Sequence, residues 1–386
     1  MKIVLATNAL KGSLTAAQAG EAMRAGIHAA LPEADVQIIP VSDGGDGLVE
    51  ALAEPLSAEL HKYTVSGPLG ASTEATFLHC PDKQLAVIEM ATASGLALLS
   101  ESELDAMAAS SRGTGELISA ALDLGCKHIV LGIGGSATTD GGTGLATALG
   151  MRFLDDSGKA LAGNGTQLAK IRHIDHSGVD TRLASVRFDV ACDVDNPLLG
   201  ERGAANIYAP QKGATASQVA RLEQGLENLA DVIRHDTGKD VRRIAGSGAA
   251  GGMGAGLVAF FDATLKPGAQ LVLELLGLET AIEGADLVLT CEGRLDHQTR
   301  FGKAPAAVAQ LARKHDVPCI AIAGMLDDSA YALTDIGFNA VFSLCPGPVS
   351  LEDAIRNADH YLRNTTQQII RCQQLPASQK PAGQKW

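Results

Sequence analysis

The chain has 386 residues, of which 46% are hydrophobic, 19% are charged and 3% are aromatic. This length predicts two domains, and the hydrophobic content excludes a disordered chain. The formal net charge of −13 and the scarcity of aromatic side chains argue against nucleic acid or an anionic membrane as a partner. An anionic ligand would therefore need local Lys, Arg and backbone amides to hold it.

The first residues form a strand-like run, without the pattern of a signal peptide. No apolar run approaches the roughly 20 residues that a membrane span needs. The seven cysteines are odd in number, dispersed and without a CxxC pair. Such cysteines are typical of reduced thiols, so we expect a cytoplasmic protein.

Apolar strand-like runs alternate with helical patterns near both ends of the chain. Ser13 or Thr15 would cap the first helix and Pro32 would end it. Five such strands with intervening helices predict one doubly wound, Rossmann-like parallel sheet. The expected strands are 3–6, 36–41, 287–290, 319–323 and 340–344, and the expected helices are about 15–31, 304–315 and 351–371.

The two halves of this predicted sheet are separated by more than 200 residues. We therefore expect a discontinuous α/β domain, residues 1–62 with 283–372, and an inserted mixed α/β domain, residues 63–282. The polar, proline-containing tail 373–386 is predicted to be disordered. Within the insertion we expect helices at about 115–124 and 217–234 and strands at 129–133 and 187–191.

The most informative segment is LGIGGSATTDGGTG, residues 131–144, which follows a short apolar run. Glycines let the backbone pass close to a ligand, and exposed amides then favour an anion. The segment is a candidate for phosphate or substrate binding through Gly134, Gly135, Ser136, Thr138, Asp140, Gly141 and Gly142.

Two glycine patterns also suggest a dinucleotide site. Residues 132–137 fit GxGxxA after a strand, and residues 246–251 fit GxGxxG without a convincing strand before them. In the first pattern Asp140-Gly141-Gly142 interrupts the helix that should begin at once. A nicotinamide-dependent hydroxyacid dehydrogenase is therefore the alternative function.

Charged side chains follow the predicted strands of the discontinuous domain, where ligands bind in open α/β sheets. Lys11 and Ser13 precede the first helix, where an anion is favoured, although an ordinary cap with a solvated lysine explains them too. Asp43 lies in a glycine turn that suits Mg²⁺ or simply caps the next helix.

The strand at 287–290 is followed by an acid, a base and an acid: Glu292, Arg294 and Asp296. This order of charges suits a site that binds a metal ion and a phosphate group together. The alternative interpretation is an ordinary ion pair at the surface. Each segment is ambiguous alone. Their coincidence at successive strand ends, with a glycine loop from the insertion, predicts phosphoryl transfer in a cleft.

Ten motifs, in order over roughly residues 1–371, resemble the type 1 bacterial glycerate kinase family. They are NALKGSL at 8–14, DGGDG at 43–47, GPLG at 67–70, EMATASGL at 89–96, SRGTGELI at 111–118, GIGGSATTDGG at 132–142, ACDVDNPL at 191–198, PQKGA at 210–214, GAAGGMG at 248–254 and EGRLD at 292–296.

The resemblance implies an ATP- and Mg²⁺-dependent kinase that phosphorylates D-glycerate, most simply to 2-phospho-D-glycerate. It implies a flavodoxin-like domain, a second α/β domain and an active site between them, and it leaves a homodimer open. A non-catalytic metabolite sensor on the same fold is a further alternative.

On this basis we assign roles as a hypothesis. Lys11, Asp193 and Arg294 are the predicted catalytic residues: the two cations neutralise the transferring phosphoryl group, and Asp193 accepts or orients the substrate hydroxyl proton. Asp43, Glu292 and Asp296 are the predicted metal ligands.

This sequence departs from the family pattern at several positions. Asn8 stands where the family commonly has Asp, which removes a charge from that position. Cys291 stands where the family usually has Gly, and it would carry strain if that position needed a positive φ.

Overall fold

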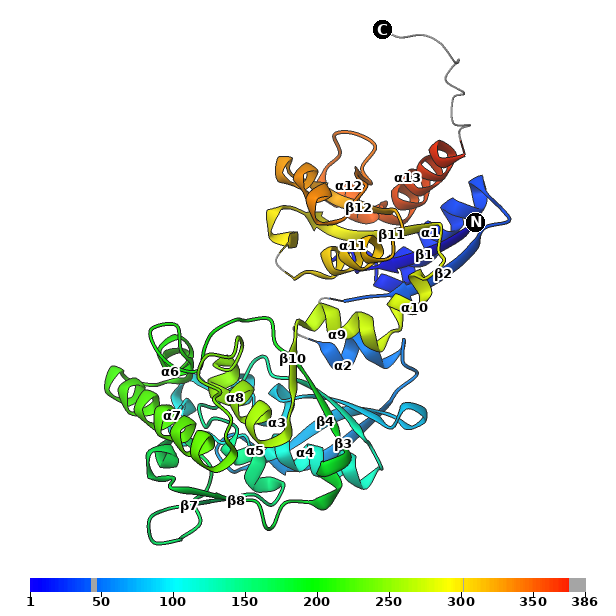
Figure 1. Cartoon of the computed structure of the whole chain (residues 1–386). Helices are drawn as coiled ribbons and strands as arrows, with labels where there is room; N and C mark the ends of the chain where they lie inside the picture. Colours follow the sequence, from blue (N-terminus) through cyan, green and yellow to red (C-terminus); the bar gives the residue numbers. More distant parts are fainter. Residues whose placement is uncertain (43–46, 301, 375–386) are drawn as a thin grey trace, which may run out of the picture. The chain divides into compact units, whose positions relative to one another are not determined.

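The computed structural model describes residues 1–42, 47–300 and 302–374. The chain forms two compact units, drawn in Figure 1. Residues 1–43 and 272–386 make up the terminal unit, and residues 44–271 make up the inserted unit. The predicted architecture, a discontinuous parallel-sheet domain interrupted by a mixed α/β insertion, is confirmed.

The division between the units falls at different residues from those expected, which were 62/63 and 282/283. Strand β3, Glu59–Ser66, crosses the first expected boundary and pairs along its whole length with β4, Ser72–Cys80. A strand cannot be split between two sheets without losing this ladder, so the inserted unit begins before β3.

The terminal unit contains a five-stranded sheet in which every neighbouring pair is parallel, in the order β13-β12-β11-β1-β2. Counted along the chain within this unit and read from β2, the order is second, first, third, fourth, fifth. This is the flavodoxin-like order, whose switch point lies between β1 and β11. The strands are β1 Lys2–Thr7, β2 Asp35–Pro40, β11 Leu287–Leu295, β12 Cys319–Leu326 and β13 Ala340–Ser343.

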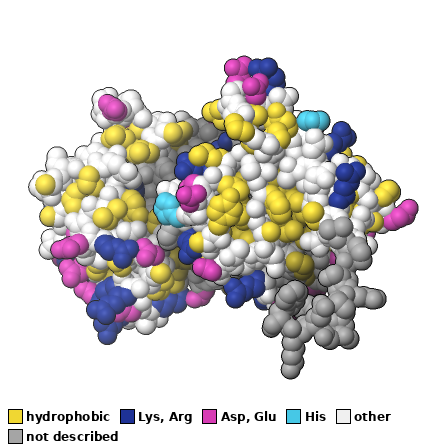
Figure 2. Space-filling view, turned by 90° about the horizontal axis from the view of Figure 1, so that it is seen from above, with side chains coloured by type: hydrophobic (Ala, Val, Ile, Leu, Met, Phe, Trp, Pro, Cys, Tyr) yellow, Lys and Arg dark blue, Asp and Glu magenta, His cyan; other side chains and the backbone are white. Residues whose placement is uncertain are grey.

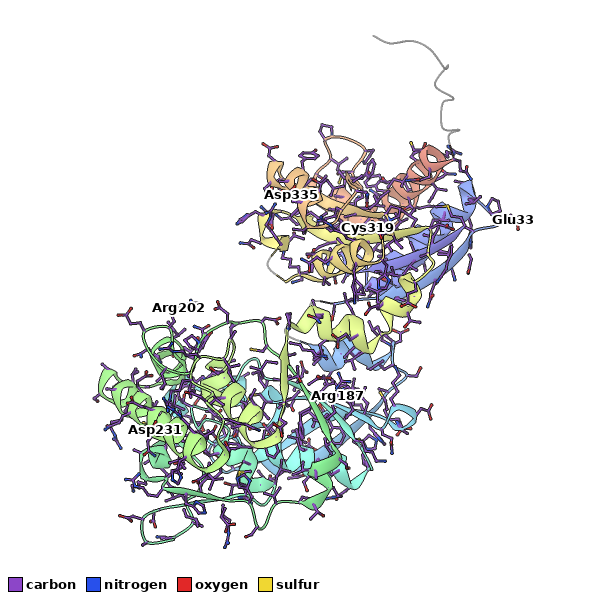
Figure 3. The ribbon with its side chains drawn as sticks, in the orientation of Figure 1. Glu33, Arg187, Arg202, Asp231, Cys319 and Asp335 are labelled. Atoms are coloured by element: carbon purple, nitrogen blue, oxygen red, sulfur yellow. The ribbon has the colours of Figure 1, made fainter. Side chains whose placement is uncertain are left out.

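Helices cover both faces of this sheet because its strands alternate two sets of buried side chains. Ile3 and Leu5 of β1 pack with Met23 of α1, Ala16–Ala30, and Leu362 of α13, Ala358–Gln373. The opposite face contacts α10, Leu278–Ile282, and α11, Ala304–Lys314. Figure 3 marks Cys319, which begins β12 and is fully buried.

Local signals explain where one helix of this unit begins and where another ends. Thr15 caps α1 with a capping box, in which its side chain accepts from the Gln18 amide and the Gln18 side chain accepts from the Thr15 amide. The single helix expected at 351–371 is instead two helices, α12 (Leu351–Arg356) and α13, which meet at Asn357. The Asn357 side chain donates to the Asp353 carbonyl and so closes the end of α12.

The inserted unit is built on a six-stranded mixed sheet in the order β10-β9-β6-β5-β4-β3. Four of its strands, β5, β6, β9 and β10, are parallel, and β4 and β3 extend the sheet as an antiparallel hairpin. The parallel strands are β5 Leu85–Glu89, β6 His128–Gly132, β9 Arg187–Ala191 and β10 Thr264–Lys266, and a separate hairpin pairs β7 Arg152–Leu154 with β8 His173–Asp175.

Seven helices in the described part of the inserted unit surround these strands. The expected helices at 115–124 and 217–234 are α4 and α7. The seven are α2 Leu48–Ala53, α3 Ala91–Ser94, α4 Arg112–Asp123, α5 Thr143–Ala148, α6 Ala204–Tyr208, α7 Ala216–Thr237 and α8 Ala249–Phe261. An eighth helix, α9 Gly268–Leu275, contains the point at which the chain passes from one unit to the other.

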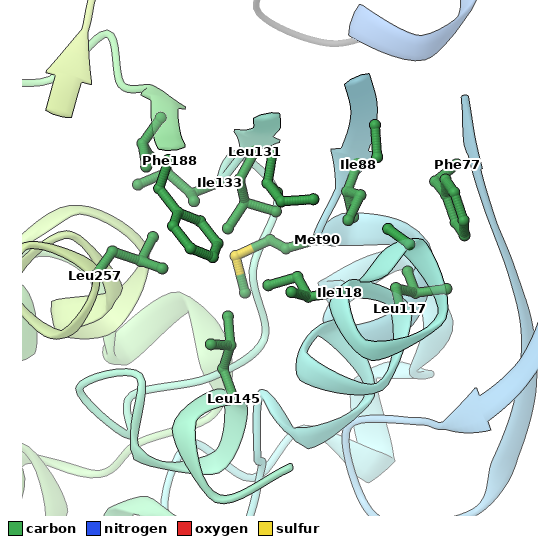
Figure 4. Close-up of a cluster of buried hydrophobic side chains, with 14 of the residues drawn as sticks. Phe77, Ile88, Met90, Leu117, Ile118, Leu131, Ile133, Leu145, Phe188 and Leu257 are labelled. Atoms are coloured by element: carbon green, nitrogen blue, oxygen red, sulfur yellow. The ribbon is translucent and has the colours of Figure 1, made fainter. Parts of the chain in front are cut away.

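Met90 lies at the centre of the main core of the inserted unit (Figure 4). Leu131 and Ile133, at the end of β6, pack beside it, and Ile118 of α4 and Leu145 of α5 close the cluster. This buried support fixes the end of β6, from which the glycine-rich loop departs.

On the face drawn in Figure 2, acidic and basic side chains are interspersed among apolar ones, so this face has no extended field of one sign. Every helix within the described ranges is too short or too polar to cross a bilayer.

Candidate active site

The inserted unit has a cavity of about 510 Å³ at the carboxyl ends of β6 and β9. Ligands bind at this edge of open α/β sheets, because loops and helix N-termini converge there. The cavity is lined by Leu96, Gly132, Ile133, Gly134, Gly135, Ser136, Ala191, Cys192, Asp193, Val194, Tyr208, Gln211, Lys212, Ala249 and Ala250. Of the predicted site residues, the structure thus brings Gly134, Gly135, Ser136 and Asp193 to one cavity.

Gly134 and Gly135 form the exposed tip of the glycine-rich loop. Gly135 has a φ of +68°, and a Cβ atom at Gly134 would meet no atom within 4 Å. Within the described residues, neither amide donates a hydrogen bond, whereas the Gly135 carbonyl accepts from the Leu96 amide at 2.8 Å. These two amides remain available to an anion in the cavity.

The second glycine-rich segment, at the start of α8, packs directly on this loop. Ala250, Gly251 and Gly252 all have left-handed backbone, with φ values of 51°, 69° and 89°. The Gly251 carbonyl accepts from the Gly141 amide at 3.1 Å. A Cβ atom on Gly251 would lie 2.0 Å from the Thr138 carbonyl oxygen, so only glycine permits this approach.

We expect Gly251→Ala to lower the free energy of unfolding by about 3 kcal/mol or more, because it combines a positive φ with a backbone collision. Ala250→Gly is the matched control, since it relieves the same kind of φ without a new contact, and we expect it to raise stability by about 1 kcal/mol. Urea denaturation of both variants measures the difference. Equal stability of the two variants would contradict the close contact.

Asp140 organises the loop from inside the protein. Its carboxylate accepts hydrogen bonds from the Ser111 amide and hydroxyl at 2.8 and 2.7 Å and from the amides of Gly142 and Gly144 at 3.0 and 3.3 Å. Burial raises the pKa of Asp140, and these hydrogen bonds oppose the rise. The predicted ligand residue is fully buried and does not line the cavity, so its contacts assign it a structural role.

Lys212 is a functional candidate that the sequence does not indicate. It is 2% exposed, and its ammonium group donates to the Ser136 hydroxyl at 2.8 Å and to the Thr138 carbonyl at 2.7 Å. Burial lowers the pKa of Lys212 to about 7, and the negative charge of Asp140 opposes that change. Lysines are rarely this buried. The only sequence signal was its place in the PQKGA motif, which says nothing of burial.

Asp193 lies just beyond the end of β9. One carboxylate oxygen accepts from the Gly268 amide at 2.8 Å, which holds the side chain at the cavity. Tyr208, on another lining segment, donates to the Asn196 side chain at 2.7 Å. An oriented carboxylate beside free amides suits an anionic substrate that also carries a hydroxyl.

The dinucleotide interpretation of the loop does not fit the local structure. A dinucleotide fingerprint needs a helix that begins at once after the strand. Here ten residues separate the end of β6 at Gly132 from the start of α5 at Thr143, and Gly142, with a φ of 76°, is the N-cap. The loop presents amides, but it lacks the helix N-terminus that would hold a pyrophosphate.

A second set of predicted residues lies at the switch point of the terminal unit. The loop after β1 and the end of β11 approach each other there, since a Cβ atom on Gly293 would lie 3.7 Å from the Lys11 amide nitrogen. Lys11 is exposed. The Ser13 hydroxyl instead donates to the Ile355 carbonyl at 2.7 Å, so Ser13 is held by α12.

Glu292, Arg294 and Asp296 share the end of β11 with two further charged residues, Lys303 and Asp327. Arg294 pairs with Asp296 at 3.1 Å and with Asp327 at 3.6 Å, and Lys303 lies 4.0 Å from Glu292. The carboxylates are the oxygen ligands that Mg²⁺ prefers, and the cations suit phosphate. The ion pairs of the alternative interpretation are therefore present, and they lie at the switch point of the sheet.

Asp43, the third predicted metal ligand, lies outside the described residues. Cys291 lies inside β11 and pairs with Thr7 and Ile322, so its backbone is extended and carries no positive-φ strain. Burial raises the pKa of its thiol to about 12, which excludes a thiolate nucleophile.

A flavodoxin-like unit with acids and cations at its switch point, and an inserted unit with an amide-lined cavity, define an α/β enzyme of small anionic molecules. The profile of the Glycerate kinase family matches residues 3–374, and the chain belongs to that family.

Several named relatives match the chain over nearly its full length. A Bacillus subtilis protein named glycerate kinase is 44% identical over 96% of this chain and 97% of its own. An Escherichia coli K12 protein named glycerate 2-kinase is 44% identical over 93% and 94%. The crystal structure of a presumed glycerate kinase 2 from Salmonella typhimurium LT2 superposes with a TM-score of 0.83 at 43% identity, covering 97% and 98%.

Proposed function

We propose that this enzyme transfers the γ-phosphoryl group of MgATP to the 2-hydroxyl of D-glycerate. The observation that carries the proposal is the cavity of the inserted unit, where the free amides of Gly134 and Gly135 stand beside Asp193 in a chain of the glycerate kinase family. D-Glycerate combines the two groups that this lining recognises, a carboxylate and a hydroxyl.

In this proposal the cavity residues bind an anionic group and prepare the hydroxyl. The amides of Gly134 and Gly135 hold the anion, and their dipoles need no reorganisation because the loop is already fixed. Asp193, held by the Gly268 amide, orients the hydroxyl and accepts its proton as the new P–O bond forms.

The charged residues of the terminal unit are the proposed contacts of the polyphosphate and its metal. Lys11 and Arg294 neutralise phosphate charge, and Glu292 and Asp296 hold Mg²⁺ directly or through water. When bound, Mg²⁺ offsets the negative charge that moves onto the leaving phosphate. The donor set fits this ion, since it consists of carboxylates, on side chains that are 12% exposed in Glu292 and 9% exposed in Asp296.

A coupled assay of ADP release with MgATP and D-glycerate tests the proposal, and phosphorus NMR identifies the product. ADP release that depends on glycerate, with phosphate on carbon 2, supports the function and its position. Phosphate on carbon 3 would support the kinase activity and overturn the proposed position of the phosphate. Absence of glycerate-dependent ADP release by folded protein would overturn the substrate and favour a metabolite sensor.

We also propose a cytoplasmic location and a homodimer. Seven unpaired cysteines, four of them buried, support a reducing compartment. Free thiols in protein taken directly from cells, counted under denaturing conditions, test the location, and light scattering at several concentrations tests the assembly.

A further inference from the structure

Lys212 connects the lining of the cavity to the glycine-rich loop. An ammonium group has three donors, of which two are used by Ser136 and the Thr138 carbonyl. The residues that accept these hydrogen bonds flank the tip of the loop, and Lys212 itself lines the cavity. The lysine therefore joins the lining of the cavity to the segment that carries the free amides.

We propose that Lys212 is the positioning residue of this cavity: it holds the 134–138 segment in an anion-binding shape and supplies the counter-charge of the bound anion. The inference rests on the proposed function only for the identity of the anion, a carboxylate or a phosphate. The chain carries 13 more negative than positive charges, so a cation beside these amides favours an anion against the overall charge of the protein.

The charge state of Lys212 depends on its neighbours. Asp140 acts on it from the glycine-rich loop, and Cys192, Asp193 and Tyr208 are the titratable side chains of the other segments that line the cavity. Because burial lowers the pKa of Lys212 to about 7, its amine is largely neutral at pH 8 in the empty cavity. An arriving anion favours the charged form, so binding at pH 8 should take up a proton.

Calorimetry at pH 8 in two buffers of different ionisation enthalpy measures this proton directly. D-Glycerate and a non-hydrolysable MgATP analogue are tested separately, which distinguishes a carboxylate from a phosphate as the anion. We expect proton uptake with one of them in the wild type and none in Lys212→Met. Lys239→Met is the matched control, since Lys239 also donates to two carbonyls, of Val258 and Ala259, but does not line the cavity.

Steady-state kinetics provides the second readout. We expect Lys212→Met to raise the KM of the affected ligand by about 10- to 100-fold below pH 7, with the ratio to wild type shrinking as the pH rises to 8.5. Lys212→Arg, which cannot lose its charge, should restore part of the affinity at high pH. Absence of proton uptake with both ligands, or a Lys212→Met enzyme with unchanged KM at every pH, would overturn the proposal.

These outcomes separate the inference from the proposed function. Wild-type protein that takes up a proton with the nucleotide analogue but phosphorylates no glycerate keeps the role of Lys212 and overturns the reaction. Glycerate phosphorylation that Lys212→Met leaves unaffected keeps the reaction and overturns the role of Lys212.

A second, independent feature lies on the β3–β4 hairpin. Glu59 and His61 are two residues apart on β3 and share a face, and His79 of β4 pairs directly with Glu59. One ligand atom from each of the three side chains lies within 4.8 Å of the others. His61 Nε2 is already 3.3 Å from Glu59 Oε2, and the rings of His61 and His79 lie 5.3 Å apart.

His79 is the most buried member of this cluster. It is 8% exposed, and its ring packs edge-on against that of His61. Imidazole nitrogens are among the commonest metal ligands in proteins. We infer that Glu59, His61 and His79 bind one Zn²⁺ ion, with water in the fourth position, because two imidazoles and a carboxylate suit this ion.

The test uses untagged, metal-free protein and Zn²⁺ in competition with a chromophoric chelator. We expect one equivalent to bind, and His61→Phe, which keeps the ring stacked on Phe77, to weaken binding by about tenfold or more. His360→Ala, an exposed histidine outside the cluster, is the control. Binding that His61→Phe and Glu59→Gln leave unchanged, or no binding near one equivalent, would overturn the site.

Discussion

Asp193→Asn is expected to lower kcat for glycerate phosphorylation by about 10²- to 10⁴-fold, the usual range for loss of a general base. The variant should fold normally, because the amide oxygen of Asn can still accept the hydrogen bond from the Gly268 amide. The KM values should change much less, since the anion-binding amides belong to a different segment. Initial-rate kinetics with both substrates measures the separation.

Asp195→Asn is the matched control for this prediction. Asp195 lies two residues further along the same segment, with a side chain that is 73% exposed and paired with Arg202. The same change of charge there should leave kcat within about twofold, because exposed ion pairs contribute little. Near-normal turnover by folded Asp193→Asn protein would remove Asp193 from the proposed mechanism.

The strands of the terminal unit were predictable because each is a short apolar run followed by a helix with its own start and stop signals. The strand order was not, since the pairing of β1 with β11 joins residues such as Ile3 and Leu287, and no local pattern records that contact. The break of the last helix at Asn357 was missed for a related reason. An Asn inside a periodic helical pattern is tolerated, and only the observed bond to Asp353 shows that the helix ends there.

The candidate site, like the fold, was predictable from the sequence only in part. The exposure of backbone amides in the loop was predictable, because glycines have no side chains to cover them. The partners of Lys212 lie 74 and 76 residues away in sequence, so its burial could not be predicted from Pro210, Gln211 and Gly213 around it. Asp140 was expected at the ligand for its place among hydroxyls, but the turn at Gly141 and Gly142 directs it inward.

Asp140→Ala is expected to produce the largest loss of stability, about 3–5 kcal/mol in the free energy of unfolding. The substitution leaves the Ser111 hydroxyl and three buried amides without their acceptor, and each buried donor without a partner is costly. Urea denaturation followed by circular dichroism measures the loss, and glycerate-dependent ADP release should fall with it because the loop shape depends on the same bonds.

Asp155→Ala tests whether burial, rather than the number of hydrogen bonds, causes this loss. Asp155 accepts three local hydrogen bonds, from the Ser157 amide and hydroxyl and the Lys159 amide, but it is only partly buried. Water replaces the carboxylate there, so we expect a much smaller loss of stability and no loss of activity. Similar losses in the two variants would mean that Asp140 contributes as an ordinary turn residue, and the loop would then owe its shape to the glycines and Lys212.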